Sequence, residues 1–211
     1  MVPPKMTLLS RDKPQKMAGV AECVARLLIQ HGLAGVTHAR VARAAHVSRA
    51  WLYKYVGSSR EDLVRFTTEH FGNLLAEFDQ RPRTDSRETW LADTVEGMRA
   101  LLAHASQHPW LLPLYFRYQA TETVLGTTIA EMERLYIATT AAEMKQALGL
   151  DQPSASWAAE LLLAFRMAFA YRHQRTGLLR PREFERLSAL LVRLVDQPAA
   201  GPLLPGAARR P

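Results

Sequence analysis

The sequence has a single cysteine, Cys23, among its 211 residues. A chain with one cysteine forms no intramolecular disulfide, so a secreted domain held together by disulfides is excluded and the reducing cytoplasm is the expected location. Cys23 falls on the apolar side of a predicted helix, where a small buried hydrophobe is a better explanation than a nucleophile.

Long apolar runs are also lacking. The most apolar stretch, 161–171, is interrupted by Arg166 and is too short to span a bilayer, and residues 1–16 lack the continuous apolar segment of a signal peptide. We therefore expect no membrane partner. Hydrophobic residues nevertheless make up 48% of the chain, enough for a core in one large domain or in a small and a medium one.

The alternation of polar and apolar residues that marks a β-strand is missing as well. Apolar residues instead recur at intervals of three and four, and this spacing predicts an all-α chain of about nine helices. Glycine and proline separate the predicted segments, as Gly149 and Pro153 do. The expected helices are 17–31, 37–45, 48–55, 60–79, 86–106, 109–118, 121–148, 154–174 and 182–195.

Positive charge is concentrated in the first part of the chain. Residues 1–60 hold ten Lys or Arg and two acids, a net charge of +8, whereas the remainder holds seventeen basic and eighteen acidic residues. A segregated basic segment suits binding to a polyanion, because each cation that neutralises a phosphate releases a condensed counterion. On charge alone, an ordinary solvated basic surface explains the pattern equally well.

Residues 37–55 have the pattern of two short helices joined by a tight turn. Thr37 and Ser48 stand where an N-cap oxygen would accept hydrogen bonds from free backbone N–H groups. If the second helix buries Leu52, its other side chains project from a helix narrow enough to enter a DNA major groove. We therefore predict a helix-turn-helix.

The side chains of this segment suit contacts with DNA. Arg49 can donate a bidentate pair of hydrogen bonds to guanine, Ala50 lets a thymine methyl approach, and the backbone amides after Thr37 can receive a phosphate. The alternative is a core hairpin whose aromatic residues are ordinary packing residues. The expected DNA-binding residues are Thr37, His38, Ser48, Arg49, Ala50, Trp51, Tyr53, Lys54, Tyr55 and Arg60.

The segment GLAGVTHARVARAAHVSRAWLYKYVGSSREDLV, residues 32–64, resembles the TetR family of bacterial transcriptional regulators. The residues at the spacing of the family are Thr37, Val41-Ala42, Val47-Ser48, Leu52-Tyr53, Tyr55 and Asp62-Leu63. Three positions depart from the pattern of the family, which often has Gly at His46, a small residue at Trp51 and Lys at Ser59. The first departure predicts strain in the turn, and Arg60 would replace the missing lysine as a phosphate contact.

The resemblance implies an N-terminal three-helix helix-turn-helix domain and a C-terminal helical bundle. We expect a flexible N-terminus at 1–12, the DNA-binding domain at 13–58, and a ligand-binding and dimerisation domain at 59–195. Residues 196–211, with four prolines and two glycines, are expected to form a flexible tail.

A homodimer is the expected assembly, because one helix-turn-helix makes few base contacts and two copies would fit successive major grooves about 34 Å apart. The helix beginning at Ser154 is apolar over almost its whole circumference and, with the expected helix 182–195, is the best candidate for the interface. A central core helix within one subunit is the alternative explanation.

The middle helices carry aromatic residues, methionines and phenolic hydroxyls, a mixture that suits a small, largely apolar effector. The same residues are also typical of a plain core. The family resemblance implies that the effector favours a dimer that no longer fits a palindromic operator, which releases the DNA. The expected ligand-binding residues are Met98, Leu102, Trp110, Tyr115, Phe116, Tyr118, Met132, Tyr136, Phe165 and Phe169.

Other classes of function have weaker support. His104 and His108 have the spacing of two metal ligands on one helix, but no carboxylate or cysteine nearby completes a set. We therefore expect no enzyme, no catalytic residues, no metal and no cofactor. A non-specific nucleic-acid binder, an effector-independent regulator and an activator remain alternatives to a ligand-released repressor.

Overall fold

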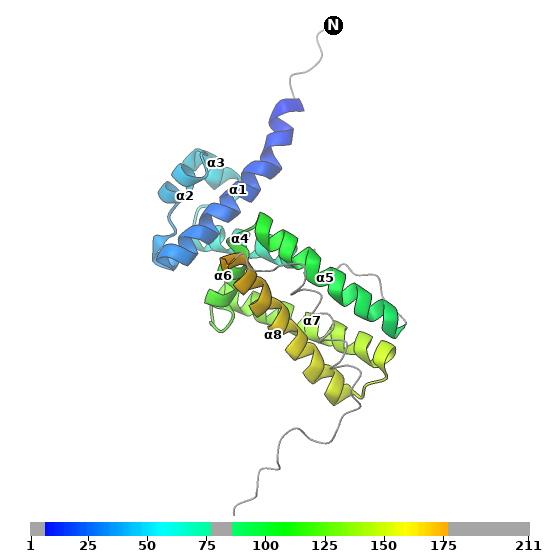
Figure 1. The fold of residues 1–211 in the computed structure, drawn as a ribbon. Coiled ribbons are helices and arrows are strands. Elements are labelled where there is room, and N and C mark those ends of the chain that lie inside the picture. Colours follow the sequence, from blue (N-terminus) through cyan, green and yellow to red (C-terminus); the bar gives the residue numbers. More distant parts are fainter. Residues whose placement is uncertain (1–6, 77–85, 177–211) are drawn as a thin grey trace, which may run out of the picture.

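The computed structural model describes residues 7–76 and 86–176 (Figure 1). These two ranges contain eight α-helices, one 3₁₀ turn and no strand, so the all-α prediction is confirmed. None of the described helices is both long and apolar enough to cross a membrane. The helix expected at 182–195 and the tail expected at 196–211 lie outside the described residues.

The N-terminal helices form a small head at one end of the molecule (Figure 1). The first helix begins at Thr7, within the segment 1–12 that the sequence indicates as flexible, because no glycine or proline interrupts the chain between Thr7 and Lys13. Pro14 lies inside this helix. The elements of the head are α1 (Thr7–His31), the 3₁₀ turn η1 (Leu33–Gly35), α2 (His38–Ala44) and α3 (Arg49–Tyr55).

The remaining helices form a larger body, in which α5, α7 and α8 lie side by side (Figure 1). Helix α4 connects the two parts, because it contacts α1 of the head and α7 of the body. The expected domain boundary at residue 58 falls just before α4. The elements of the body are α4 (Arg60–Ala76), α5 (Arg87–Gln107), α6 (Leu111–Tyr118), α7 (Val124–Leu148) and α8 (Gln152–Thr176).

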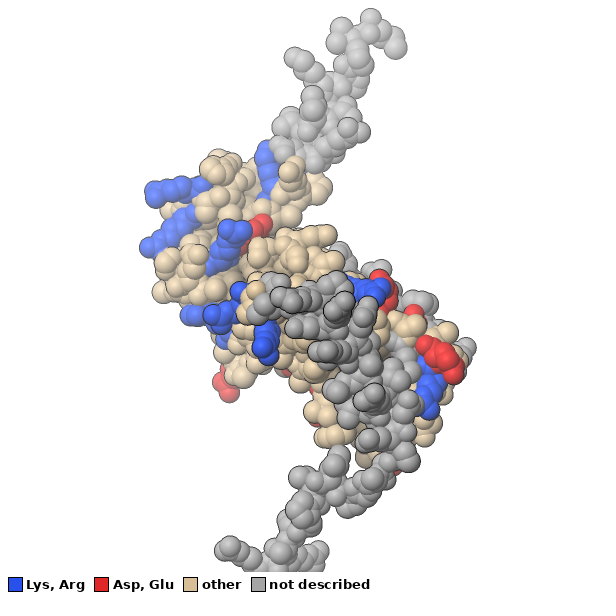
Figure 2. Space-filling model, viewed as in Figure 1, with Lys and Arg blue, Asp and Glu red and all other residues tan. Residues whose placement is uncertain are grey.

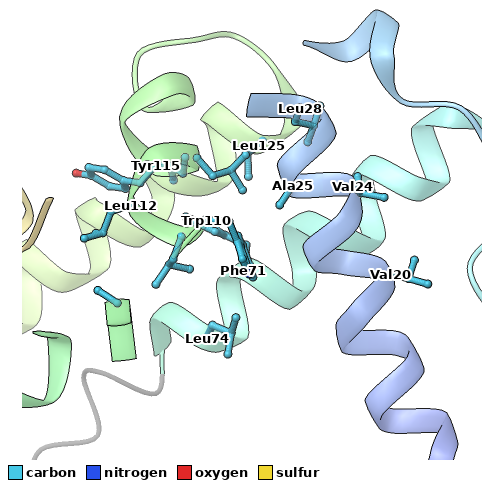
Figure 3. Packing of buried hydrophobic residues seen from close by; sticks show 14 of the residues in the cluster. Val20, Val24, Ala25, Leu28, Phe71, Leu74, Trp110, Leu112, Tyr115 and Leu125 are labelled. Carbon is cyan, nitrogen blue, oxygen red and sulfur yellow. The ribbon is translucent and has the colours of Figure 1, made fainter. Parts of the chain in front are cut away.

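One apolar core runs from the head into the body (Figure 3). Val24 of α1 and Phe71 of α4 are fully buried, and Leu125 of α7 is buried with them. The rings of Phe71 and Trp110 pack with their centroids 6.5 Å apart. Because interiors of this kind are close-packed, the shared core joins the head firmly to the body.

A second, smaller cluster lies between α5, α7 and α8. Trp90 of α5 is its one large aromatic residue among the described side chains, and small residues of α8 such as Ala159 let the helices approach closely. The buried members are Trp90, Ala141, Met144, Ala155, Ala159 and Leu162.

Candidate nucleic-acid interface

Both helices of the predicted helix-turn-helix begin at the expected caps. The Thr37 hydroxyl accepts a hydrogen bond from the backbone N–H of Arg40, with 3.3 Å between oxygen and nitrogen, and α2 starts at the next residue. The Ser48 hydroxyl accepts from the N–H of Trp51 at 3.1 Å, and α3 starts at Arg49. The predicted N-caps are therefore confirmed, and they fix where the short helix α3 begins.

The turn between the two helices is made by His46 in the left-handed conformation, with φ of +53°. The N–H of Val47 donates to the carbonyl of Ala42 across 3.0 Å, the bond that closes a helix when the intervening residue is left-handed. Histidine tolerates this conformation better than most residues other than glycine, yet a side chain there costs about 1 kcal/mol or more. The strain expected from the departure at His46 is present.

We predict that His46→Val lowers the free energy of unfolding by about 1–3 kcal/mol, because a β-branched side chain is strongly disfavoured at positive φ. His46→Gly should leave the stability unchanged or raise it, by about 1 kcal/mol at most, since glycine relieves the strain but gains freedom in the unfolded chain. Urea unfolding of the two variants beside the parent protein measures this. Equal stability of the valine and glycine variants would contradict it.

Helix α3 divides the expected DNA-binding residues between two faces. Leu52 is fully buried and fastens the helix to the head. Arg49, Ala50, Tyr53 and Lys54 are exposed, and positions separated by one, four and five residues share one face of a helix. We call this exposed face, formed by Arg49, Ala50, Tyr53 and Lys54, the recognition face.

Trp51 and Tyr55 lie at the margin of the recognition face and not on it. Both are half-buried, and their ring centroids are 5.0 Å apart. The Tyr55 ring also lies beneath two ammonium groups, those of Lys13 of α1 at 4.5 Å and Lys54 at 5.1 Å from its centroid. Trp51, which stands where the family often has a small residue, therefore packs from α3 against the core of the head.

His38 and Arg60 are held by the backbone of neighbouring segments. The Nε2 atom of His38 lies 3.0 Å from the carbonyl oxygen of Gly57, and its ring packs against Tyr53 with the centroids 4.8 Å apart. His38 thereby supports one residue of the recognition face. The Nε–H of Arg60 donates to the carbonyl of Val36 at 3.1 Å, and the rest of this exposed side chain can still reach a phosphate.

A reciprocal cap begins α4, and the sequence analysis missed it. The Ser59 hydroxyl accepts from the N–H of Asp62 at 3.0 Å, and the Asp62 carboxylate accepts from the N–H of Ser59 at 2.9 Å and of Ser58 at 3.1 Å. The Ser-x-x-acid spacing was the available signal. Gly57 is required beside it, because a Cβ there would lie 2.3 Å from the Cβ of Asp62.

The hydrogen bonds from the Ser59 N–H and hydroxyl, with a smaller contribution from Ser58, lower the pKa of Asp62. A carboxyl whose pKa is lowered by folding stabilises the fold above its unfolded pKa, and this contribution is lost as the pH falls through the folded value. We predict that Asp62→Asn destabilises the protein at pH 7 and that this difference shrinks below about pH 4. Chemical unfolding over pH 3–7 measures it, and a difference independent of pH would contradict it.

Basic side chains gather on the head around the recognition face (Figure 2). Their side chains are exposed, so they can pair with phosphates at little cost of desolvation. The exposed cations of α1, α2 and α3 that form this basic surface are Lys13, Arg40, Arg43, Arg49 and Lys54.

The expected ligand-binding residues of α6 pack toward α1, α7 and α8. The Tyr115 hydroxyl donates to the carboxylate of Glu133, and burial, followed by this hydrogen bond, raises the pKa of Tyr115. The Tyr118 hydroxyl donates to the backbone carbonyl of Leu28 at 3.3 Å, which joins α6 to the end of α1. Phe116 packs against Tyr171 of α8, with the ring centroids 4.8 Å apart. Trp110 is buried in the same core.

The other expected ligand residues are distributed over three helices. Met98 is buried in α5, and Leu102 of the same helix is partly buried beside the core. Phe165 and Phe169 stack on α8 with their centroids 5.7 Å apart. On α7, the sulfur of Met132 lies opposite Gly72 of α4, 3.8 Å from where a Cβ would be. Tyr136 of α7 accepts a hydrogen bond from Arg166, a buried residue that the sequence analysis did not select.

The residues considered for other chemistry have ordinary surroundings. The rings of His104 and His108 are 4.4 Å apart, but no group of three or more His, Cys, Asp or Glu suited to a metal occurs in 7–76 or 86–176. Partial burial raises the pKa of the Cys23 thiol, which opposes formation of the reactive thiolate.

Comparison with known proteins identifies the family that the head resembles. Residues 25–65 match the model of the family described as "Bacterial regulatory proteins, tetR family". The chain carries a TetR-family DNA-binding domain. The match spans the helix-turn-helix and the start of α4, so the head is the part of the chain that is similar to the DNA-binding domains of these regulators. A search of curated proteins found no match.

Solved structures show that the TetR-like fold continues through the body. A TetR-like transcriptional regulator from Rhodococcus sp. RHA1 is 18% identical, with a TM-score of 0.62 over 92% of this chain and 96% of that one. A TetR-family regulator from Streptomyces coelicolor is 16% identical, with a TM-score of 0.59 over 91% and 92%. A fatty acid degradation regulator from Bacillus halodurans is 13% identical, with a TM-score of 0.57 over 85% and 94%.

Proposed function

We propose that the protein is a dimeric repressor that binds a palindromic operator and is released from it by a small, largely apolar effector. The observation that best supports DNA binding is the composition and exposure of the recognition face. A capped helix presents an exposed arginine, a small residue and two longer polar side chains, and cations surround it. This combination suits base contacts in a major groove supported by phosphate contacts.

The dimer is supported by the exposed apolar residues of α8. Trp157 is 58% exposed and Leu161 is 49% exposed, and their spacing of four places them on one face of the helix. Large apolar side chains that share an exposed face are typical of a protein–protein interface. Two copies joined there would carry two recognition faces, as a palindrome requires.

Ligand release is supported by the tight connection between body and head. The hydrogen bond between Tyr118 and Leu28 and the continuous core couple α6 to α1, so a change in the packing of the body alters the position of the head. An effector acts through this connection if it binds the released conformation more tightly than the DNA-bound one. A regulator of this kind works in the cytoplasm, where its DNA is.

Selection of bound sequences from a random DNA duplex pool, at two salt concentrations, tests the proposal. An inverted repeat should be recovered at both, because direct readout by two subunits prefers the correct site by about a thousandfold or more. Recovery of no motif, together with a steep dependence on salt, would instead indicate a non-specific nucleic-acid binder. Added apolar compounds that never weaken operator binding would favour an effector-independent regulator, and reporter expression separates repression from activation.

A further inference from the structure

Arg166 is a buried cation in the middle of the body. The residue is 3% exposed, and its Nη1 donates to the hydroxyl of Tyr136 on α7 across 2.8 Å. Its buried Nε has no hydrogen-bond partner, and none of the salt bridges found among the described residues involves it. A guanidinium taken out of water without an anion is costly, so these surroundings suit an anionic partner.

Two buried threonine hydroxyls without a hydrogen-bond partner lie on helices that pack against α8; the buried polar atoms without a partner on α5 also include Asp93 Oδ2, beside Thr94. Thr140 is fully buried on α7, one helical turn from Tyr136, and Thr94 is 3% exposed on α5. The hydroxyl oxygens of Thr94 and Thr140 make no hydrogen bond. Threonine in a helix usually satisfies its hydroxyl on a preceding carbonyl, as Thr67 does on Leu63 at 2.8 Å, so the two unsatisfied hydroxyls are unusual.

The packing of the three helices brings these groups to one level of the body. Thr94 lies one turn beyond Trp90, and Arg166 lies one turn beyond Leu162, which belongs to the same cluster as Trp90. Helices α5 and α8 run in the same direction, because the side-chain amide of Gln174 donates to the carbonyl of Ala105 at 2.9 Å further along. Helix α7 runs in the opposite direction. Ala141 and Met144 of α7 belong to the cluster of Trp90 and Leu162, so Thr140 and then Tyr136 follow that cluster toward the start of α7.

We propose that Arg166, held in place by its hydrogen bond to Tyr136, binds the carboxylate of a small organic acid together with the hydroxyls of Thr94 and Thr140. Nε and Nη2 form one edge of a guanidinium, the edge that pairs with both oxygens of a carboxylate, and the bond to Tyr136 uses the other side. A monoanion is favoured over a phosphate dianion, because a single arginine would leave the second negative charge unpaired in an apolar interior.

The surroundings of Arg166 define the rest of the ligand. Met167 of α8 is 6% exposed and Met98 of α5 is 3% exposed, and both belong to the apolar core with Phe165 and Phe169 packed against it. Flexible thioethers and aromatic rings adapt to an apolar body of varied shape. The ligand is therefore an acid with an alkyl or aryl group. Its role as the releasing effector rests on the proposed function.

Calorimetric titration of the full-length protein, without DNA, tests the site directly. The probes are octanoate and phenylacetate, each beside its neutral amide, octanamide and phenylacetamide. At least one acid should bind saturably and about tenfold or more tighter than its amide, because the amide keeps the shape but loses the charge. No saturable binding by either acid, or equal affinity of acid and amide, would overturn the proposal.

Variants of the anchor separate a binding role from a structural one. Arg166→Gln and Tyr136→Phe should each weaken the acid by about tenfold or more and reduce the preference for acid over amide. Arg172→Gln, an exposed arginine on the same helix, is the matched control and should bind like the parent protein. If Arg166→Gln does not fold, Arg166→Lys replaces it, since lysine keeps the charge but lacks the fork and should still lose about tenfold. Full acid binding by the folded Arg166 and Tyr136 variants would overturn the proposal.

Operator binding by the same variants is measured separately. The acid titration contains no DNA, so its result does not depend on whether the protein binds an operator. A negative acid titration therefore contradicts only the acid site, and a negative operator experiment contradicts only the proposed function. Acid that binds at Arg166 and also releases the operator identifies the site as that of the effector.

Discussion

Replacement of Arg49 by alanine is expected to abolish most of the preference of the protein for its operator over random DNA. Arg49 is the first residue of α3, exposed on the recognition face, and it forms no salt bridge found among the described residues. Its guanidinium is therefore available for guanine. A bidentate contact of this kind contributes about 1–3 kcal/mol of discrimination, or roughly fivefold to 150-fold for each half-site of a dimer. Competition binding with operator and scrambled duplexes measures the loss.

The matched control for this prediction is Lys54→Ala on the same face. The ammonium of Lys54 lies near the Tyr55 ring at the far end of α3, and an exposed ammonium there can reach a phosphate but makes no bidentate contact with a base. Its loss should weaken binding to operator and scrambled DNA alike and lower the salt dependence by about one charge per subunit. Equal losses on both duplexes for the Arg49 and Lys54 variants would contradict the division of the recognition face into a base contact and a phosphate contact.

The head was largely predictable because its signals are local in sequence. The caps at Thr37 and Ser48 and the buried Leu52 depend on spacings within one or two helical turns, which a sequence shows directly. The cap of Ser59 on Asp62 is equally local, and its Ser-x-x-acid spacing is a signal that the sequence carries. Trp51 shows the limit, since its partial burial depends on how α3 packs against the core of the head, which the local sequence does not show.

The body was predictable as helices but not as a site. The hydrogen bond between Arg166 and Tyr136 joins residues thirty positions apart, and that between Tyr118 and Leu28 joins residues ninety apart, so neither has a signature in the sequence. In the sequence, Arg166 interrupts an apolar stretch and resembles an exposed position. Its burial follows from the approach of α7 and α8, which brings the Tyr136 ring to 5.7 Å from the guanidinium carbon.

Replacement of Trp157 or Leu161 by glutamate is expected to convert a dimer into a folded monomer. Both side chains are about half exposed in a single chain, so a charge there costs little within the subunit but must be buried when two copies meet. Val124→Glu is the matched control, because Val124 is 59% exposed at the start of α7 and lies outside α8. Size-exclusion chromatography with light scattering should show the dimer for the control and the monomer for the two α8 variants.

Loss of the dimer should remove operator binding almost completely, and it should do so with an unchanged recognition face. In a dimer the second head binds within the same complex at a high effective concentration, which contributes roughly a hundredfold to ten-thousandfold to affinity. The α8 variants should therefore bind a full operator no better than a single half-site, whereas Arg49→Ala remains a dimer that has lost its preference. A Trp157→Glu protein that stays dimeric and keeps its operator affinity would show that the subunits meet through another surface.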